Sequence, residues 1–369
     1  MSEQQPIRSI NSPTLGDGIT RLYTEGDLLY TRMLAVIGAA CHSIKLESYI
    51  FADDEIGRRF TAALGERARA GIQVQVNIDA AGSLFWTSRK LKRMLKAGGV
   101  RLRWFHRWNW RAMWRYNRRN HRKLLVVDGR VGFLGGFNIH RENSRAIYGE
   151  ARWRDTHVEV HGQLAHNLQT LFDAFWRGRR RTCPIIRSRQ AILITNHSHR
   201  SRLLLRNLYA ARFTIARQRI WLTTPYLVPD HRTQRGLKLA AKRGIDVRVL
   251  VPNKSDVRIA QWAAHAAYAG LLIAGVKIYR YQPRILHAKT IVIDGYWSSL
   301  GTANIDYRSF FLNYELNLAS HNRKLAAVLE SQFLTDLAES EQIYPKIWVQ
   351  RGWYARALEF IGWLGRRWL

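Results

Sequence analysis

Apolar runs and mixed polar segments follow one another in the same order in both halves of the chain. Short strand-like runs lie at 43–51, 71–79 and 97–105, and again at 219–227, 244–252 and 274–281. The segments that precede 71–79 and 244–252 are rich in Ala, Arg and Lys, a composition typical of helices. The order strand, helix, strand, helix, strand predicts an α/β fold with right-handed crossovers in each half.

The match between the halves indicates an internal repeat. Equivalent runs are 173 to 177 residues apart up to Val100 and Val276, but the offset falls to 166 between His121 and His287. The first half therefore carries ten extra residues, which fall within 104–120.

The repeat also sets the expected domain boundaries. A basic stretch containing Pro184 separates the halves. We expect a first lobe at 1–185, a second lobe at 186–340 and a tail at 341–369 that has no counterpart in the first half.

Each half contains one copy of the same polar motif inside its apolar frame. The first copy is NHRKLLVVDGRVGFLGGFNI, and the second is LHAKTIVIDGYWSSLGTANIDYRS. The shared positions are His121, Lys123, Asp128 and Asn138 in the first copy, and His287, Lys289, Asp294 and Asn304 in the second. One H-x-K-x4-D would be weak evidence, but two copies at equal spacing indicate a site.

The spacing of His and Lys suits phosphodiester chemistry. Residues two apart on a strand point to the same face, so each half presents an imidazole beside an ammonium group. If the halves pack about a pseudo-twofold axis, the two pairs meet in one cleft. One imidazole can then attack phosphorus while the other transfers the proton, and the lysines and asparagines stabilise the phosphate oxygens. This chemistry requires no metal, and the sequence shows no metal-ligand cluster.

A nucleophilic histidine needs an acceptor for its second ring nitrogen. The candidates are Glu315, 28 residues after His287, and Asp155, 34 residues after His121, with Glu159 as a competitor. Asp128 and Asp294 belong to the repeated motif, but their strand parity is opposite to that of the histidines. We expect these two to pair with backbone or with Arg/Lys near the interface between the halves.

The charge of the chain narrows the class of partner. There are 59 Lys and Arg against 27 Asp and Glu, giving +32, together with 14 Trp. Such a charge attracts polyanions, either nucleic acid or an anionic membrane, and Trp favours the membrane interface. Two cysteines form no disulfide framework, and we find neither a signal peptide nor an apolar stretch long enough to span a bilayer.

Tryptophan and arginine are concentrated in two segments. They include Trp104, Trp108, Trp110 and Trp114 before the first motif, and Trp353, Trp363 and Trp368 in the tail. We expect these side chains to contact a membrane, with the tail forming an interfacial helix. The alternatives are a solvated basic loop for the first segment and a helix docked on the core for the tail.

The duplicated motif, with its downstream Gly/Ser/Thr-x-x-Asn, resembles that of the phospholipase D superfamily, over about 22 to 337. Within it, the chain is similar to short bacterial cardiolipin synthases that lack N-terminal transmembrane helices. The resemblance implies two α-β-α sandwich lobes with the active site at their interface. It also implies transfer of a phosphatidyl group between two phosphatidylglycerol molecules on the cytoplasmic face of the inner membrane, as a peripheral protein.

The resemblance further suggests roles for individual residues. His121 is the expected nucleophile and His287 the expected acid and base, although the near-symmetry makes this assignment reversible. Gly136 stands where Ser or Thr is often found, as Thr302 is in the second copy, so the halves are not equivalent if that hydroxyl holds phosphate.

Two other activities fit the same residues. A phospholipase D would use water as the acceptor, and a nuclease or phosphodiesterase would use the histidines on a nucleic-acid backbone. The Trp/Arg segments favour the bilayer over nucleic acid, but nothing in the sequence separates transfer from hydrolysis.

Overall fold

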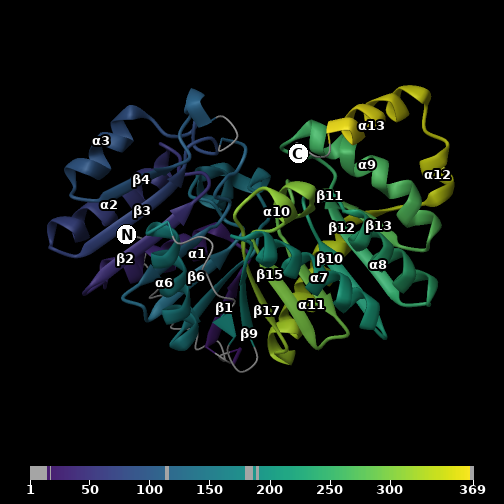
Figure 1. Ribbon diagram of the computed structural model, residues 1–369, viewed down its shortest axis with the longest axis horizontal. Helices are drawn as coiled ribbons and strands as arrows, with labels where there is room; N and C mark the ends of the chain where they lie inside the picture. The colour runs from purple at the N-terminus through teal and green to yellow at the C-terminus, as the bar shows by residue number, and fades with distance from the viewer. Residues whose placement is uncertain (1–14, 17, 113–115, 179–185, 188–190, 366–369) are drawn as a thin grey trace, which may run out of the picture.

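The computed structural model describes residues 15–16, 18–112, 116–178, 186–187 and 191–365. Two α/β lobes lie side by side, the first in purple and blue and the second in green and yellow (Figure 1). Each lobe is built on one mixed sheet, and the two sheets have the same strand order at their centres. The predicted fold class is confirmed.

The first sheet has seven strands, in the order β1-β7-β6-β5-β2-β3-β4. Its strands are β1 (Ile19–Tyr23), β2 (Ser43–Ser48), β3 (Gln73–Asp79), β4 (Arg101–Phe105), β5 (Leu124–Val127), β6 (Val131–Gly135) and β7 (His157–His161). Strands β2, β3 and β4 pair in parallel, as the sequence predicts, and the remaining pairs are antiparallel.

The second sheet repeats this order and adds a strand at each edge, giving β18-β13-β12-β10-β14-β15-β17-β9-β8. Its strands are β8 (Ile186–Arg187), β9 (Ala191–Thr195), β10 (Arg219–Thr223), β12 (Asp246–Pro252), β13 (Lys277–Tyr281), β14 (Thr290–Ile293), β15 (Trp297–Gly301), β17 (Leu316–Ser320) and β18 (Ser340–Ile343). A short parallel pair, β11 (Leu227–Val228) with β16 (Ile305–Asp306), lies beside it. Because β18 pairs with β13, the second lobe continues past the boundary expected at 340.

Helices cover the sheets in equivalent places. The first lobe has α1 (Gly26–Gly38), α2 (Glu55–Arg69), α3 (Arg89–Ala97), α5 (Arg145–Tyr148) and α6 (Gln163–Trp176). The second has α7 (His199–Ile215), α8 (His231–Lys242), α9 (Arg258–Ile273), α10 (Tyr307–Phe311), α11 (Arg323–Ala338), α12 (Pro345–Val349) and α13 (Trp353–Gly365). In the described ranges, none of these helices has the length and apolarity needed to cross a membrane.

Side chains of alternate parity on β5 serve two different cores. Leu125 and Val127 pack with α1, α2 and α3 in the core of the first lobe. Leu124 and Val126 instead join a cluster that includes Leu316 of β17 and residues of α6 and α11. This shared cluster holds the two lobes together and fixes the position of the motifs that precede β5 and β14.

The Asp-Gly of each motif forms the turn of a hairpin. Asp128 and Gly129 have φ of 53° and 65°, and Asp294 and Gly295 have 54° and 62°. Glycine, and to a lesser degree Asp, tolerates this left-handed conformation, which lets β5 and β14 reverse directly into β6 and β15. The ten extra residues of the first half follow β4, in the connection that leads to Asn120.

Candidate active site

The backbone of each motif is hydrogen-bonded to the opposite lobe. Asn120 forms a parallel bridge with Tyr314, and Leu286 forms one with Arg154. The N–H of His121 donates to the carbonyl of Tyr314 at 2.9 Å, and the N–H of His287 donates to that of Arg154 at 2.7 Å. The two histidines are therefore held at the seam between the lobes by equivalent contacts.

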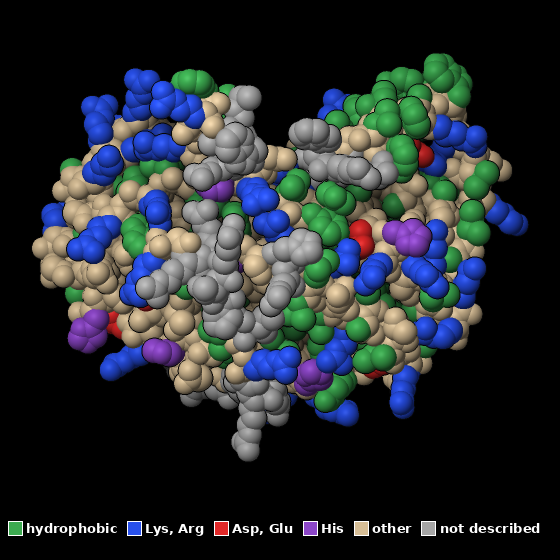
Figure 2. All heavy atoms as spheres, viewed as in Figure 1, with side chains coloured by type: hydrophobic (Ala, Val, Ile, Leu, Met, Phe, Trp, Pro, Cys, Tyr) green, Lys and Arg blue, Asp and Glu red, His purple; other side chains and the backbone are tan. Residues whose placement is uncertain are grey.

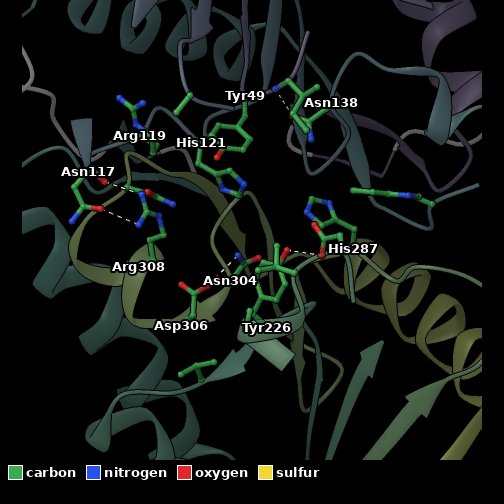
Figure 3. Close-up of a pocket in the computed structure, with 18 of the residues that line it drawn as sticks. Tyr49, Asn117, Arg119, His121, Asn138, Tyr226, His287, Asn304, Asp306 and Arg308 are labelled. Carbon is green, nitrogen blue, oxygen red and sulfur yellow. Dashed lines mark hydrogen bonds between the residues drawn. The ribbon is translucent and has the colours of Figure 1, made fainter. Parts of the chain in front are cut away.

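Both imidazoles line one cavity of about 540 Å³. The rings lie across this cavity from each other, in the centre of Figure 3, with Asn138 and Asn304 on its walls. Arg119, Arg308 and Asn117 gather on one side, where Arg308 donates to the carbonyl of Asn117 at 2.9 Å. The predicted convergence of the two copies is thus present in the structure.

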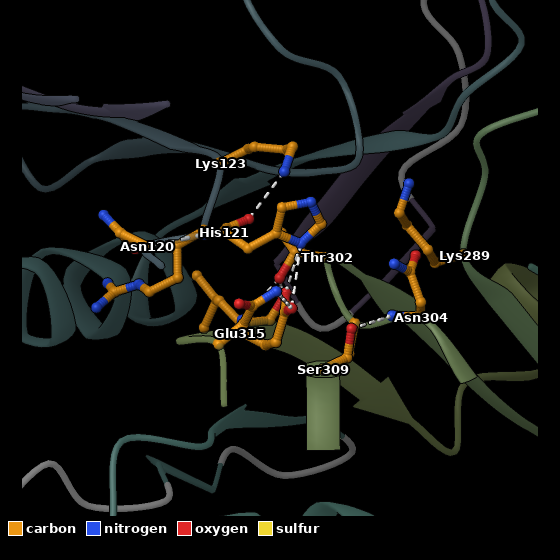
Figure 4. A network of polar contacts seen from close by, with 12 residues as sticks. Asn120, His121, Lys123, Lys289, Thr302, Asn304, Ser309 and Glu315 are labelled. Carbon is orange, nitrogen blue, oxygen red and sulfur yellow. Dashed lines mark hydrogen bonds and ion pairs between the residues drawn. The ribbon is translucent and has the colours of Figure 1, made fainter. Parts of the chain in front are cut away.

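The carboxylate behind each histidine comes from the other lobe. His121 Nδ1 lies 2.9 Å from Glu315 (Figure 4), and His287 Nδ1 lies 2.5 Å from Asp155. The sequence indicates both carboxylates as acceptors but does not assign them, and in the structure each one contacts the histidine of the opposite half. The competitor Glu159 accepts from Tyr23 at 2.7 Å instead. The exchange arises because each carboxylate directly follows the residue that bridges to the opposite motif.

The lysines lie beneath the histidines. Lys123 Nζ donates to the backbone carbonyl of His121 at 2.9 Å, and Lys289 Nζ donates to that of His287. Both side chains are buried, and neither is among the residues that line the cavity. Their expected contact with a phosphate therefore stays a prediction.

Burial and like charges shift the titration of these groups. Burial lowers the pKa of His121 well below its usual value, and the charges of Lys123 and Lys289 lower it further. Burial, followed by the charge of Lys289, lowers the pKa of Lys123 to about 7. Burial raises the pKa of Glu315 to about 7. His121 is therefore an uncharged imidazole at neutral pH, with Nδ1 held by Glu315 and Nε2 without a hydrogen-bond partner among the described residues.

The glycine at position 136 makes room for Asp155. A Cβ at Gly136 would lie 1.9 Å from Asp155 Oδ1, so no larger residue fits there without moving the carboxylate. In the second copy, Thr302 Oγ1 accepts from the backbone N–H of Leu316 at 2.9 Å (Figure 4 shows its position). This hydroxyl supports β17 beside Glu315 and is fully buried, so it is not placed to meet a ligand directly.

The two motif aspartates lie away from the cavity. Asp128 accepts from the backbone N–H groups of Cys41, His42 and Ser43 at 2.7 to 2.8 Å. Asp294 accepts in the same way from 217–219 at 2.8 to 2.9 Å. They fix the starts of β2 and β10, as the backbone pairing predicts, but this is the outer end of each strand. The expectation that they lie near the interface between the halves is wrong.

This geometry agrees with known relatives. A family model described as "Cardiolipin synthase, PLD-like domain" matches residues 33–176 and 209–337. A cardiolipin synthase from Halalkalibacterium halodurans is 36% identical over 95% of this chain and 72% of its own length. One from Listeria monocytogenes is 34% identical over 94% of this chain and 74% of its own. The chain belongs to the cardiolipin synthase family of phospholipase D-like proteins.

A solved structure of a different enzyme has the same fold. A phosphatidylserine synthase from Haemophilus influenzae matches with a TM-score of 0.74 at 12% sequence identity, covering 96% of each chain. At that identity the likeness concerns the fold alone. The two lobes are thus an arrangement that distant sequences share.

The sequence alone does not indicate several of the residues that line the cavity. They are Tyr49, Trp153, Tyr226, Asp256, Asp306, Arg308 and Asn313. A signal existed for the two tyrosines, because each ends a matched strand-like run. No comparable signal marks Asp79, whose buried carboxylate accepts from the N–H of Asn120 at 2.7 Å and so holds the start of the first motif. In the described part of the chain, no group of three His, Cys, Asp or Glu is placed to bind a metal ion.

The tryptophans expected at a membrane differ in placement. Trp104 of β4 is partly buried against the core of the first lobe, and its ring centroid lies 4.2 Å from Lys92 Nζ, so its contact with a membrane stays a prediction. Trp108, Trp110 and Trp353 are 63%, 71% and 81% exposed, and Trp363 is half-exposed. Trp114 and Trp368 lie outside the described residues.

Proposed function

We propose that this protein is a phosphatidyltransferase that makes cardiolipin by moving a phosphatidyl group from one phosphatidylglycerol to a hydroxyl of a second. The observation that carries the proposal is the pair of imidazoles facing one cavity, each with Nδ1 held by a carboxylate of the opposite lobe. The family membership supports the choice of lipid substrate, and the cavity is large enough for a headgroup.

The first half-reaction forms a covalent intermediate. The free Nε2 of His121 attacks phosphorus, an N–P bond forms, and the bond from phosphorus to the glycerol oxygen breaks. His287 gives a proton to that oxygen, and glycerol leaves. Burial and the charge of Lys289 lower the pKa of His287, and the ionised Asp155 at its Nδ1 opposes that shift, so Asp155 supports the protonated ring that this step requires.

The second half-reaction reverses these roles. His287 takes the proton from a hydroxyl of the second phosphatidylglycerol, and the oxygen attacks phosphorus. The N–P bond breaks, cardiolipin forms, and His121 recovers its lone pair. Asn138 donates to the phosphate in both half-reactions: its Oδ1 accepts from the backbone N–H of Ile50 at 3.1 Å, and this supports a role for its amide N–H groups toward phosphate. One such preorganised donor is worth about 3 kcal/mol of barrier.

The surface supports a peripheral position on an anionic membrane, which we place on the cytoplasmic face. Hydrophobic side chains gather over α13 at the top right of Figure 2, and Lys and Arg are spread over the face shown. The exposed residues there include Trp353, Tyr354, Phe360, Ile361, Trp363 and Leu364. Aromatic side chains at headgroup depth and basic side chains near anionic lipid both favour binding.

Labelled phosphatidylglycerol in vesicles tests the proposal, with the lipid products identified by mass spectrometry. The expected products are cardiolipin and glycerol. We expect His121→Ala and His287→Ala each to reduce turnover on the order of 10³-fold or more, since groups that act as a unit fail together.

Other products would point elsewhere. Phosphatidic acid without cardiolipin would replace the transferase by a phospholipase D. Cleavage of DNA or RNA with no lipid product would favour a nuclease. Substantial turnover in either histidine variant would contradict the shared site.

A further inference from the structure

The cavity wall beside His287 carries an acidic pair that the mechanism does not use. Tyr226, at the end of the run that contains β10, donates its hydroxyl to Asp256 Oδ1 at 2.6 Å. Both residues line the cavity, and the negative charge of Asp256 acts on both His287 and Lys289. Figure 3 places Tyr226 on the side of His287, away from Arg119 and Arg308.

The pair breaks the symmetry of the repeat. The matching run of the first lobe also has a tyrosine near its end, Tyr49, one position earlier in the register, whose ring lies edge-on to His121 with centroids 5.0 Å apart. The loop that follows β3, where the second lobe has Asp256 after β12, reads AAGSLFWT at 80–87 and contains no acid. The wall beside His121 therefore lacks the carboxylate that the wall beside His287 has.

The pair presents hydrogen-bond acceptors. Because the Tyr226 proton is committed to Asp256, the phenol oxygen and the carboxylate oxygens can only accept further bonds. An alcohol can donate to them, whereas a phosphate diester has no proton to donate and is repelled by the carboxylate. A phosphate is instead favoured on the opposite side, near Arg308.

We propose that Tyr226 and Asp256 form the alcohol subsite, binding the glycerol headgroup through the hydroxyl next to the one that reacts. This inference rests on the proposed function. Glycerol leaves and the second headgroup enters with its proton passing through His287 in both half-reactions, so one subsite beside His287 serves both. The subsite selects a vicinal diol over a simple alcohol or water.

A competition between two soluble acceptors tests the subsite on the full chain. Vesicles of phosphatidylglycerol are incubated with ¹³C-glycerol and ethanol together, and labelled phosphatidylglycerol and phosphatidylethanol are measured by mass spectrometry. The variants are Asp256→Asn and Tyr226→Phe. The control is Glu341→Gln, which changes an exposed carboxylate of β18 far from the cavity.

We expect Asp256→Asn to lower the ratio of the glycerol product to the ethanol product about tenfold or more, because a hydrogen bond to a charged group is lost. Tyr226→Phe should shift the ratio in the same direction, and Glu341→Gln should leave it unchanged. If Asp256 acted only by tuning His287, both products would fall together and the ratio would hold, which would overturn the subsite. Failure of the unaltered protein to form either product would overturn the proposed function itself.

Discussion

At the scale of single residues, the two histidines differ in the carboxylate behind them. Burial raises the pKa of Glu315 to about 7, whereas the charges of Lys289 and His287 lower the pKa of Asp155 against the effect of burial. Asp155 is therefore ionised, and it opposes the effects of burial and of Lys289, which lower the pKa of His287. Glu315 holds the His121 proton on Nδ1 without forcing a charge onto the ring, which suits a nucleophile.

The exchanged carboxylates give the first prediction. Asp155→Asn and Glu315→Gln keep the shape of each side chain but can present an amide N–H to Nδ1, which favours the wrong tautomer. We expect each to lower cardiolipin formation by at least about 10²-fold, a conservative figure beside the 10⁴-fold loss in a serine protease triad. Initial rates on labelled vesicles measure this. Equal unfolding temperatures show that the fold is intact.

The exchange also predicts which half-reaction each variant affects. With Asp155→Asn, proton transfer at His287 is impaired in both half-reactions. With Glu315→Gln, attack by His121 is impaired, so less acid-labile phosphoprotein should form in a single turnover. More phosphoprotein in Glu315→Gln than in the unaltered chain would contradict the role of His121.

The lowered pKa of Lys123 gives the second prediction. Its charged form is the protonated one, so the charge is present below a pKa of about 7 and is lost as the pH rises through that value. We expect kcat/KM to fall on the alkaline side with an apparent pKa near 7. In Lys123→Arg the guanidinium stays charged, so the fall should move to higher pH even if the rate is lower. An unmoved alkaline limb would show that another group titrates.

The residue scale also shows what the sequence could and could not predict. The two His/Lys pairs can be predicted because their spacing repeats. The carboxylate partner of each imidazole cannot. It is fixed by the backbone bridges from Asn120 to Tyr314 and from Leu286 to Arg154, which join segments far apart in sequence. For the same reason, the close approach of Asp155 to Gly136 is visible only in three dimensions.

At the scale of elements, α13 combines the two alternatives considered for the tail. It packs on α9 through Gly362, where a Cβ would lie 2.4 Å from the backbone nitrogen of Ala263. Its other apolar residues are mostly exposed. The spacing of its apolar residues predicts a helix, and the structure adds that Gly362 lets the helix dock closely on α9 while most of its apolar residues stay exposed.

This arrangement gives the third prediction. Replacing Trp353 and Phe360 by Ser should weaken binding to vesicles of anionic lipid by about tenfold or more, because burial of a large apolar side chain is worth about 1.5–3 kcal/mol. The unfolding temperature should hardly change, since both side chains are exposed. Co-sedimentation at fixed salt measures binding. Ile215→Ser, at an exposed site on α7, is the matched control. Equal vesicle binding by the unaltered protein, the Trp353/Phe360 variant and this control would show that α13 does not contact the membrane.

Some strands can be predicted from their sequence and others cannot. The parallel sets β2–β3–β4 and β10–β12–β13 follow from the matched apolar runs. The edge strand β18 has a mixed sequence, SEQI, whose register depends on a free edge of β13, so no local pattern marks it. Trp104 belongs to β4 and is partly buried, because β4 continues further into the Trp/Arg segment than the charge of that segment suggests.

At the scale of the whole molecule, the lobes share a hydrophobic cluster. Leu124 and Val126 of β5 pack with Leu316 and Leu318 of β17 at this boundary. Separating the lobes would expose this apolar surface and leave each histidine without its carboxylate. Neither lobe is therefore a complete unit, structurally or chemically.

The shared cluster gives the fourth prediction. Residues 1–185 and 186–369, produced separately, should be poorly soluble and inactive, because each exposes the boundary cluster to water. Produced together, they should associate and regain cardiolipin formation. The solubility of each fragment and the activity of the co-purified pair measure this. A soluble, active single fragment would contradict the shared site.

The two bridges that cross the seam also limit how the protein can move. A hinge that swung the lobes apart would break the His121–Glu315 and His287–Asp155 pairs at once, disassembling the catalytic groups. The chemical steps therefore take place while the two lobes stay in contact at the seam. The catalytic groups are thus preassembled across the seam before glycerol or lipid enters the cavity.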